Sequence, residues 1–414
     1  MQRLLISLSS LVAFATLAHA QPAPDAQPAP PADPTAPPVV AEPPPPPVAP
    51  AKPELPKRLA VGTLTPGSFL TLGLNLQGWF VYDETKKVVA EGAEDVNLSA
   101  STFRLRRVEV TGSGEIIPKL VKYRFMFDPA RVSEARTAVV AASPTAGATV
   151  TANVPNGPFN MLQDAWVTLA GEYADILIGQ FKTPISWDGF NSAAKLILPD
   201  RAFATTQLGG GSRDIGIRVE KTFKNFAYFG GVFNGSGQNT TDTNNQKDVA
   251  LRVEVYPVPG LTIAGMTYDS VGYRKRAGTK DRWEGDLRYE SGPFLFQGEF
   301  IQGRTVTVAA GSSVVTNSRG AYAAVGYTLK GIVGGKGDLQ PVVRFGYYDP
   351  DIDQNITPAN LAGVDERMDY EVGLNYYVRG HEMKFQVAYD RQQFDDDAVK
   401  PAINEVIVET QVWF

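Results

Sequence analysis

The sequence predicts an all-β protein: a transmembrane antiparallel β-barrel of about 16 strands that follows a disordered, proline-rich N-terminal segment. Three observations predict this fold. From Ser68 onward, segments of about ten residues alternate apolar and polar side chains. Short and long connections between these segments alternate, and the final segment ends in Phe414. The mean hydropathy of −0.15 is low for a protein with membrane-spanning helices.

The composition argues against several kinds of chemistry. The chain of 414 residues has no cysteine and two histidines, His19 and His381. Disulfides, thiolate metal sites and thiol nucleophiles are therefore excluded, and histidine catalysis or zinc chemistry is disfavoured. We expect a protein that is not an enzyme, with no catalytic residue, no cofactor, no metal site and no nucleic-acid partner.

Residues 1–20 have the features of a secretory signal peptide. Arg3 makes the first residues positive, the stretch from Leu4 to Leu17 is apolar, and Ala18 and Ala20 form a small-x-small cleavage site. The alternative is a buried N-terminal helix. Proline-rich sequence begins directly after the cleavage motif, which favours export.

Residues 21–57 are predicted to be a periplasmic linker. They hold 16 of the 31 prolines of the chain. Proline fixes φ and removes backbone donors, so neither helix nor sheet can form here and the segment is extended. We interpret it as a semi-rigid spacer; the alternative is a ligand for a wall component or a partner domain.

Residues 58–414 form the predicted barrel domain. In Ile215–Glu220, the side chains of Ile215, Ile217 and Val219 share one face, and Arg218 and Glu220 share the other. A period of two indicates a strand, and a face with charges of both signs should face water. The expected strands are 68–82, 99–114, 119–128, 160–171, 174–183, 212–222, 225–235, 246–257, 260–270, 281–290, 293–305, 318–330, 338–349, 364–379, 382–393 and 402–414.

The connections and the chain end favour the outer membrane over a secreted β-sandwich or solenoid. Short links, such as residues 115–118 and 291–292, alternate with long ones, such as residues 129–159 and 184–211, and an even strand number places both termini in the periplasm. The terminal Phe414 resembles the signal that the barrel-assembly machinery reads. Aromatic residues near strand ends are expected to face the membrane lipid and lipopolysaccharide: Trp79, Phe80, Tyr82, Tyr123, Phe125, Phe127, Trp166, Tyr347, Tyr348, Tyr376 and Tyr377.

An ordered series of motifs resembles the phosphate-selective porin O/P family of bacterial outer-membrane proteins. The series comprises Phe103–Arg107 (FRLRR), Lys122–Phe125 (KYRF), Asp164–Trp166 (DAW), Gly179–Pro184 (GQFKTP), Leu198–Ala202 (LPDRA) and Ser212–Gly216 (SRDIG). The resemblance is sharpest over about 103–220. It implies a transmembrane channel of 16 strands, usually a homotrimer, with a third loop that narrows the lumen and a preference for anions such as phosphate. The rest of the family's basic residues cannot be matched one by one.

A barrel of this size is wide enough for an aqueous channel, so something must narrow it. The segment Ile185–Gly211 is the best candidate, because it shows little alternation and long ordered loops are usually functional. The residues expected in this constriction loop are Trp187, Asp188, Lys195, Asp200 and Arg201.

Basic residues on inward faces are expected to line an anion path. They are Arg104, Arg106, Lys122, Arg124, Arg218, Arg252 and Arg344. Arg106 and Arg107 are consecutive, so one of them should point outward unless a β-bulge intervenes. The alternative is that these arginines pair with glutamates in the lumen wall, as Arg218 and Glu220 could.

We therefore expect ion transport by a passive outer-membrane channel for small hydrophilic solutes that prefers anions, with phosphate as a candidate. The alternatives are a general or cation-selective porin, and a structural or adhesive barrel whose proline-rich arm contacts the wall. An outer-membrane hydrolase is disfavoured, because no Ser/His/Asp grouping is visible in the mature chain.

Overall fold

The computed structural model describes residues 66–87, 96–132, 135–142, 149–155, 160–242, 244–271, 279–309, 312–333, 336–353, 366–395 and 401–414. They belong to one compact unit, Pro56–Phe414. The predicted signal peptide, the linker and their boundaries lie outside the described residues. No helix among the described residues is long and apolar enough to cross a membrane.

Nearly all regular structure is β. The strands are β1 (Phe69–Lys87), β2 (Val96–Ile117), β3 (Val121–Phe127), β4 (Ala135–Ala142), β5 (Thr149–Pro155), β6 (Leu162–Leu169), β7 (Asp175–Lys182), β8 (Arg213–Thr222), β9 (Phe226–Phe233), β10 (Lys247–Val255), β11 (Leu261–Val271), β12 (Lys280–Ser291), β13 (Phe294–Ala309), β14 (Ser312–Tyr327), β15 (Leu329–Val333), β16 (Lys336–Asp349), β17 (Arg367–Arg379), β18 (Met383–Phe394) and β19 (Ile403–Trp413). The short helices are η1 (Pro129–Val132), α1 (Trp187–Phe190), η3 (Ala193–Lys195) and α2 (Phe203–Gln207).

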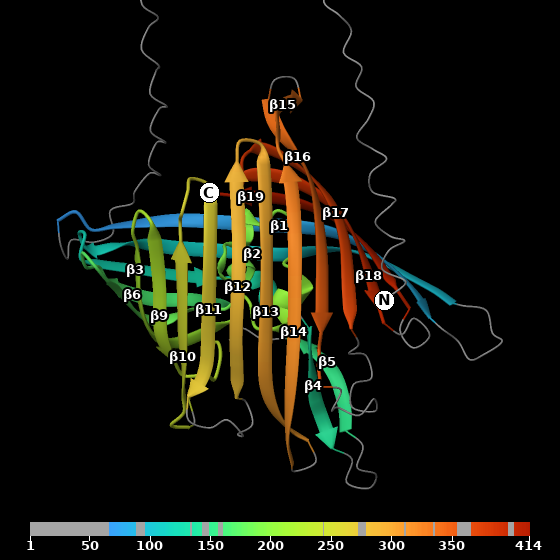
Figure 1. The fold of residues 1–414 in the computed structure, drawn as a ribbon, viewed down its shortest axis with the longest axis horizontal. Helices are drawn as coiled ribbons and strands as arrows, with labels where there is room; N and C mark the ends of the chain where they lie inside the picture. The colour runs from blue at the N-terminus through green and yellow to red at the C-terminus, as the bar shows by residue number, and fades with distance from the viewer. Residues whose placement is uncertain are drawn as a thin grey trace, which may run out of the picture. The chain divides into compact units, whose positions relative to one another are not determined.

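The strands close into an antiparallel barrel of 16 strand positions, which confirms the predicted fold class (Figure 1). Strand β1 pairs with β19 from Asn75 opposite Trp413 to Thr85 opposite Ile403, and this pairing closes the ring. Strands β14 and β15 follow one another along the same side of β16 and both pair with it, so together they count as one strand position of the ring. Strands β4 and β5 form a separate hairpin within the connection from β3 to β6.

Apolar side chains face outward and polar side chains face the interior, as the alternation predicts. On β8, Ile217 is 51% exposed on the outer face, whereas its neighbour Arg218 is buried inside. On β10, Val249, Leu251 and Val253 are exposed outside, and Arg252 lies inside. A lipid environment favours this arrangement, because exposed apolar surface then contacts hydrocarbon instead of water.

The prediction that all eleven aromatic residues face the lipid is wrong for four of them. Trp79, Tyr348 and Tyr377 are buried inside the barrel, and Trp166 lines an internal cavity. In the Tyr347–Tyr348 and Tyr376–Tyr377 pairs the period of two sends one ring of each inward. Aromatic composition alone therefore does not identify the lipid face.

The two ends of the barrel differ. At one end the strands are joined by tight turns, in which Lys119, Gly292 and Gly380 adopt positive φ angles of 63°, 58° and 51°. At the other end lie long connections, among them residues 183–212, which follow β7. Phe414 lies at the short-turn end, where it exchanges backbone hydrogen bonds of 2.9 and 3.0 Å with Leu74 of β1. Its predicted part in barrel assembly stays a prediction.

Candidate functional site

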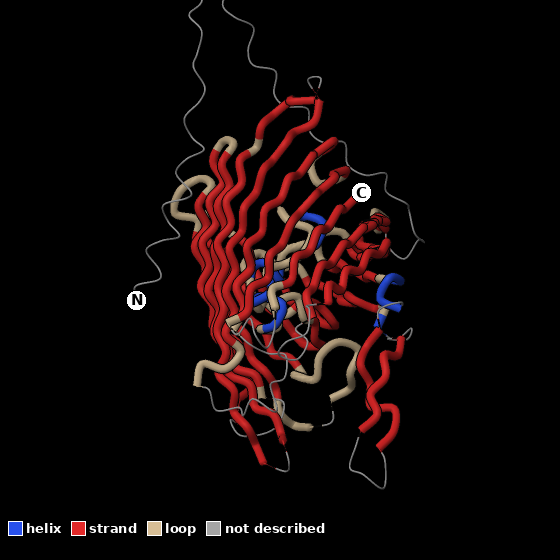
Figure 2. The backbone as a smooth tube through the Cα atoms, turned by 90° about the vertical axis from the view of Figure 1, so that its right-hand side faces the viewer, coloured by secondary structure: helices blue, strands red, loops and turns tan. Residues whose placement is uncertain are grey.

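The constriction loop, Ile185–Gly211, lies inside the ring of strands with its short helices α1, η3 and α2 (Figure 2). Inward side chains from the wall donate hydrogen bonds to its backbone carbonyls. These bonds run from Gln77 to Ala193 (3.3 Å), Gln411 to Ala194 (3.0 Å), Lys384 to Leu196 (2.8 Å), Asn375 to Ile197 (2.8 Å), Arg344 to Asp200 (3.1 Å) and Arg282 to Leu208 (2.9 Å). The wall therefore satisfies carbonyl groups that no strand pairing could reach.

Apolar packing fixes the same loop. Leu198 is 0% exposed and packs in a cluster with Tyr322, Ala324 and Val342 of the wall. A Cβ at Gly373 of β17 would lie 2.4 Å from the Leu198 side chain. Glycine therefore permits the close approach of the loop to the wall at this position.

The beginning of the loop is held by carboxylates. Glu284 and Glu299 accept hydrogen bonds from the backbone N–H groups of Trp187 (3.3 Å) and Asp188 (3.2 Å). Asp188 in turn accepts a hydrogen bond of 2.9 Å from the N–H of Ala202, which ties the two halves of the loop together. Asp188 is thus buried and holds the loop's shape, and its carboxylate is not open to a solute.

A β-bulge in β2 turns two consecutive arginines inward. Gln77 pairs with Arg107 and Gly78 pairs with Leu105, so Arg106 is the extra residue. The Arg106 guanidinium lies 5.1 Å from the centre of the buried Trp79 ring, and Arg107 donates a hydrogen bond of 2.6 Å to Gln77. The bulge thus resolves the choice between Arg106 and Arg107, because both lie inside.

Asp200 of the constriction loop faces this arginine pair. Its Oδ1 lies 3.4 Å from Nη2 of Arg106 and 3.7 Å from Nη2 of Arg107, and its side chain is 44% exposed. Burial acts to raise the pKa of Asp200, but the charges of Arg106 and Arg107 outweigh it and hold the pKa below its usual value. The Asp200 carboxylate is therefore charged at neutral pH.

A cavity of about 290 Å³ lies between the loop and strands β2, β3, β6, β7 and β8. Its charged lining consists of Arg124, Lys182, Arg213 and Arg218 together with Glu109 and Asp164. Asp164 pairs with Arg213 at 2.7 Å and with Arg124 at 3.4 Å. Lys182 donates to the loop carbonyls of Gly189 (2.9 Å) and Asn191 (2.6 Å). Four basic residues against two acidic ones leave this basic cavity with a positive surplus.

The remaining expected pore residues are in different surroundings. The guanidinium carbon of Arg104 lies 4.8 Å from the centre of the Trp79 ring. Lys122 is exposed on β3, two residues from Arg124. Arg218 pairs with Glu220 at 2.7 Å, which was the alternative to a solute-binding role.

Arg252 and Arg344 are buried and paired with carboxylates of the wall. Arg252 is 0% exposed and pairs with Glu254, Glu284 and Asp286, so it does not line an open path in this structure. Arg344 binds Glu371 through two hydrogen bonds of 2.6 and 2.7 Å. Arg252 therefore belongs to an ion-pair network, and Arg344 to a single ion pair that also holds the loop through the carbonyl of Asp200.

The other constriction-loop residues lie on its surface. Trp187 and Lys195 line a cavity toward the short-turn end. Arg201 donates a hydrogen bond of 2.8 Å to the carbonyl of Asn191 and borders a cavity against β16–β19. No group of three or more His, Asp or Glu side chains among the described residues is arranged to hold a metal ion.

Two basic residues of the site, Lys182 and Arg213, were missed from the sequence. Both lie in the motifs quoted above, in GQFKTP and SRDIG. Lys182 has the parity of the exposed Ile176 and Ile178, so the alternation of β7 predicts an outward side chain and gave no signal for its place in the cavity. Arg213 begins its strand, where alternation is too short to show direction.

The comparisons with known proteins agree with this geometry. The family model described as "Phosphate-selective porin O and P" matches residues 87–281 and 273–412. Among solved structures, the fold is similar to the outer-membrane channel DcaP of Acinetobacter baumannii, with a TM-score of 0.54 at 14% identity over 86% of this chain and 100% of that one. Salmonella typhi OmpF gives 0.52 at 12% identity (84% and 98% covered), and Pseudomonas putida OprB gives 0.51 at 12% (83% and 94%). No curated protein sequence matches the chain significantly.

Proposed function

Because the chain belongs to the phosphate-selective porin O and P family and forms an outer-membrane channel, we propose that it passes small hydrophilic anions, inorganic phosphate among them, in preference to cations. Transport is passive, and the charged side chains around the constriction loop replace part of the hydration of the moving ion.

One observation carries the anion preference: basic residues from neighbouring strands converge beside the constriction loop. Arg106 and Arg107 come from β2, Arg124 from β3, Lys182 from β7 and Arg213 from β8. Arginine suits an oxyanion because its planar guanidinium donates two parallel hydrogen bonds. We assign the path for anions to this side of the loop.

A general or cation-selective channel remains the second candidate, and a specific observation favours it. A cavity of about 310 Å³ between the loop and β16–β19 has a charged lining of five acidic and three basic residues among those described. They are Asp200, Asp369, Glu371, Asp390 and Glu405, and Arg201, Arg344 and Arg367. Cations would pass here if this acidic side carries the current. The measured ion selectivity of the channel decides which of the two sides of the loop carries the current.

The orientation and assembly belong to the same proposal. The barrel's first strand begins at the short-turn end, where Phe414 also lies, so we place this end and the proline-rich segment in the periplasm. We further propose a homotrimer, on the strength of the family.

The test is ion conductance of the purified full-length protein in a planar bilayer. Under a KCl gradient, a reversal potential that favours chloride supports the proposal, and added phosphate should reduce the chloride current in a saturable way. A reversal potential that favours potassium, with no effect of phosphate, would refute the anion preference and support the second candidate.

A further inference from the structure

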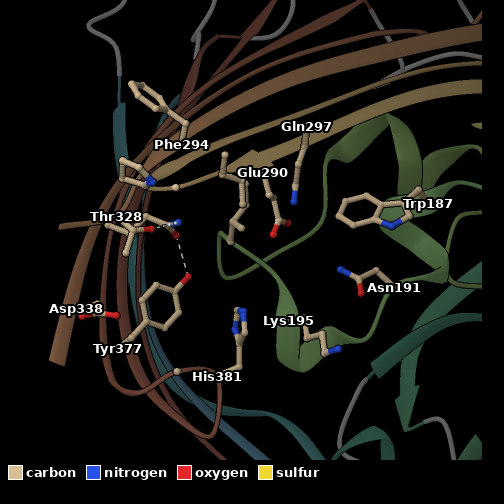
Figure 3. A pocket seen from close by; sticks show the side chains of 16 residues that line it. Trp187, Asn191, Lys195, Glu290, Phe294, Gln297, Thr328, Asp338, Tyr377 and His381 are labelled. Atoms are coloured by element: carbon tan, nitrogen blue, oxygen red, sulfur yellow. Dashed lines mark hydrogen bonds between the residues drawn. The ribbon is translucent and has the colours of Figure 1, made fainter. Parts of the chain in front are cut away.

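A second cavity, of about 480 Å³, lies on the short-turn side of the constriction loop. Figure 3 shows side chains converging on it from two directions: Trp187 and Asn191 from the loop, and Gln297, Tyr377 and His381 from the wall and its turns. Among the described residues no arginine lines it, whereas three line the basic cavity. The two cavities therefore differ in the ligands that they can hold.

Gln297 of β13 is a buried amide without a side-chain hydrogen bond to any described residue. Its side chain is 7% exposed and lines the cavity. The neighbouring Gln340, by contrast, has partners for both ends of its amide: it donates to Thr328 (3.0 Å) and accepts from Asn375 (3.0 Å) and Tyr377 (2.9 Å). An amide offers both donors and acceptors, and those of Gln297 face the cavity (Figure 3). Gln297 is thus directed at something that the cavity can hold.

Aromatic side chains bound the same space. The Trp187 indole lies on the loop side, and the Tyr377 and His381 rings, with centroids 5.3 Å apart, lie opposite (Figure 3). Burial, with help from the charges of Lys384 and Lys195, lowers the pKa of His381 to about 4, so its imidazole is neutral at pH 7. Aromatic rings offer apolar contact to the C–H surfaces of a ligand.

The charges of the lining are few and mixed. Lys195 contributes one positive charge, and Glu290 and Asp338 contribute two negative ones. An oxyanion would gain little here, because no guanidinium is present and the carboxylates repel it. A neutral ligand with many hydroxyl groups would gain hydrogen bonds from the amides and contact with the rings.

We propose that this cavity binds a small neutral saccharide, with Gln297 as the residue that hydrogen-bonds its hydroxyl groups and Trp187 as the ring that it packs against. The site is distinct from the basic cavity and accepts solute at the short-turn side of the loop.

The test is calorimetric titration of the detergent-solubilised full-length protein with maltose and, separately, with inorganic phosphate. Wild-type protein should bind maltose saturably. Gln297→Leu keeps the size of the side chain, removes the amide, and should weaken maltose binding about fivefold while phosphate binding is unchanged.

The matched control is Gln392→Leu, the same change at an inward, buried glutamine of β18 that lines the cavity against β16–β19. It should leave maltose binding unchanged. Trp187→Leu is the second variant, used if Gln297→Leu does not fold, and it should also weaken maltose binding.

No saturable heat with maltose, or equal loss in Gln297→Leu and Gln392→Leu, would overturn the saccharide site. Neither result bears on the proposed anion preference, because conductance and reversal potential test that preference independently. A channel that favours potassium while maltose still binds would refute the anion preference and leave the saccharide site standing.

Discussion

Replacing Asp200 with asparagine should make the channel bind phosphate more tightly. In the structure the Asp200 carboxylate contacts both guanidiniums of the arginine pair. Its Oδ1 lies 3.4 Å from Nη2 of Arg106 and 3.7 Å from Nη2 of Arg107. A solute oxyanion that binds the same guanidiniums must first displace this carboxylate. Asp200→Asn keeps the shape of the side chain and removes the competing charge.

The magnitude follows from distance and exposure. Two opposite unit charges at 3.4 Å interact by about 5 kcal/mol at an effective dielectric constant of about 20. The Asp200 side chain is 44% exposed, however, so solvent screening reduces the net value to about 1 kcal/mol. Removing that cost should lower the half-blocking concentration of phosphate roughly fivefold.

The assay is titration of single-channel KCl current with phosphate, for wild type and Asp200→Asn in the same bilayer system. Asp281→Asn is the matched control, because it removes a carboxylate from an ion pair of 3.0 Å with Arg304, away from the loop. Unchanged or weaker phosphate block in Asp200→Asn would refute the reasoning, since Asp200 would then not compete with the solute. An equal effect in Asp281→Asn would show that net charge alone is responsible.

Four further predictions follow from the site. Because the pKa of Asp200 is lowered, its carboxylate stays charged on acidification, so the difference in phosphate block between wild type and Asp200→Asn should persist from pH 7 to pH 5; loss of the difference by pH 5 would contradict the charge assignment. Arg124→Gln should reduce the chloride-over-potassium permeability ratio more than Lys122→Gln, because Arg124 lines the basic cavity and Lys122 is exposed; equal values would show that the cavity is not on the ion path. Gly373→Leu should displace the constriction loop and change the open-channel conductance, since even a Cβ there would lie 2.4 Å from Leu198; unchanged conductance would mean that the wall yields instead. Lys384→Met should lower thermal stability by about 1–3 kcal/mol, because it leaves the buried carbonyl of Leu196 without its donor; calorimetric unfolding of the detergent-solubilised protein measures this, and no loss would show that the bond is dispensable.

The strands could be predicted from the sequence because each one carries its own signal. The alternation around Ile217 and Arg218 is set by the pleat of a single strand, so no partner is needed to recognise it. The same local rule fails at Arg106, because the bulge that turns it inward depends on the pairing with β1. Alternation holds at Trp79, which has the parity of the buried Asn75 and Gln77. There the expectation that aromatic residues face lipid fails, because the indole donates a hydrogen bond of 2.6 Å to Glu409, 330 residues along the chain.

The position of the constriction loop could be predicted, but its anchoring could not. Loop length and the absence of alternation indicate a segment that leaves the wall. The donors that hold it, such as Lys384 and Gln411, read in the sequence as ordinary inward polar residues. Their targets are backbone carbonyls, which carry no side-chain pattern, so the sequence contains no signal that pairs Lys384 with Leu196 or Gln411 with Ala194.

This anchoring bears on how selectivity can arise. Wall side chains hold carbonyls of the loop between Ala193 and Leu208, and each buried carbonyl left without a donor costs about 1–3 kcal/mol. Swinging the loop aside would break these bonds together and would also expose Leu198, which is fully buried. A motion that costly is too rarely populated to select solutes one by one. Selectivity therefore has to come from groups that are fixed in place: Arg106 and Arg107 on the wall, and Asp200, whose carboxylate the anchored loop holds against them.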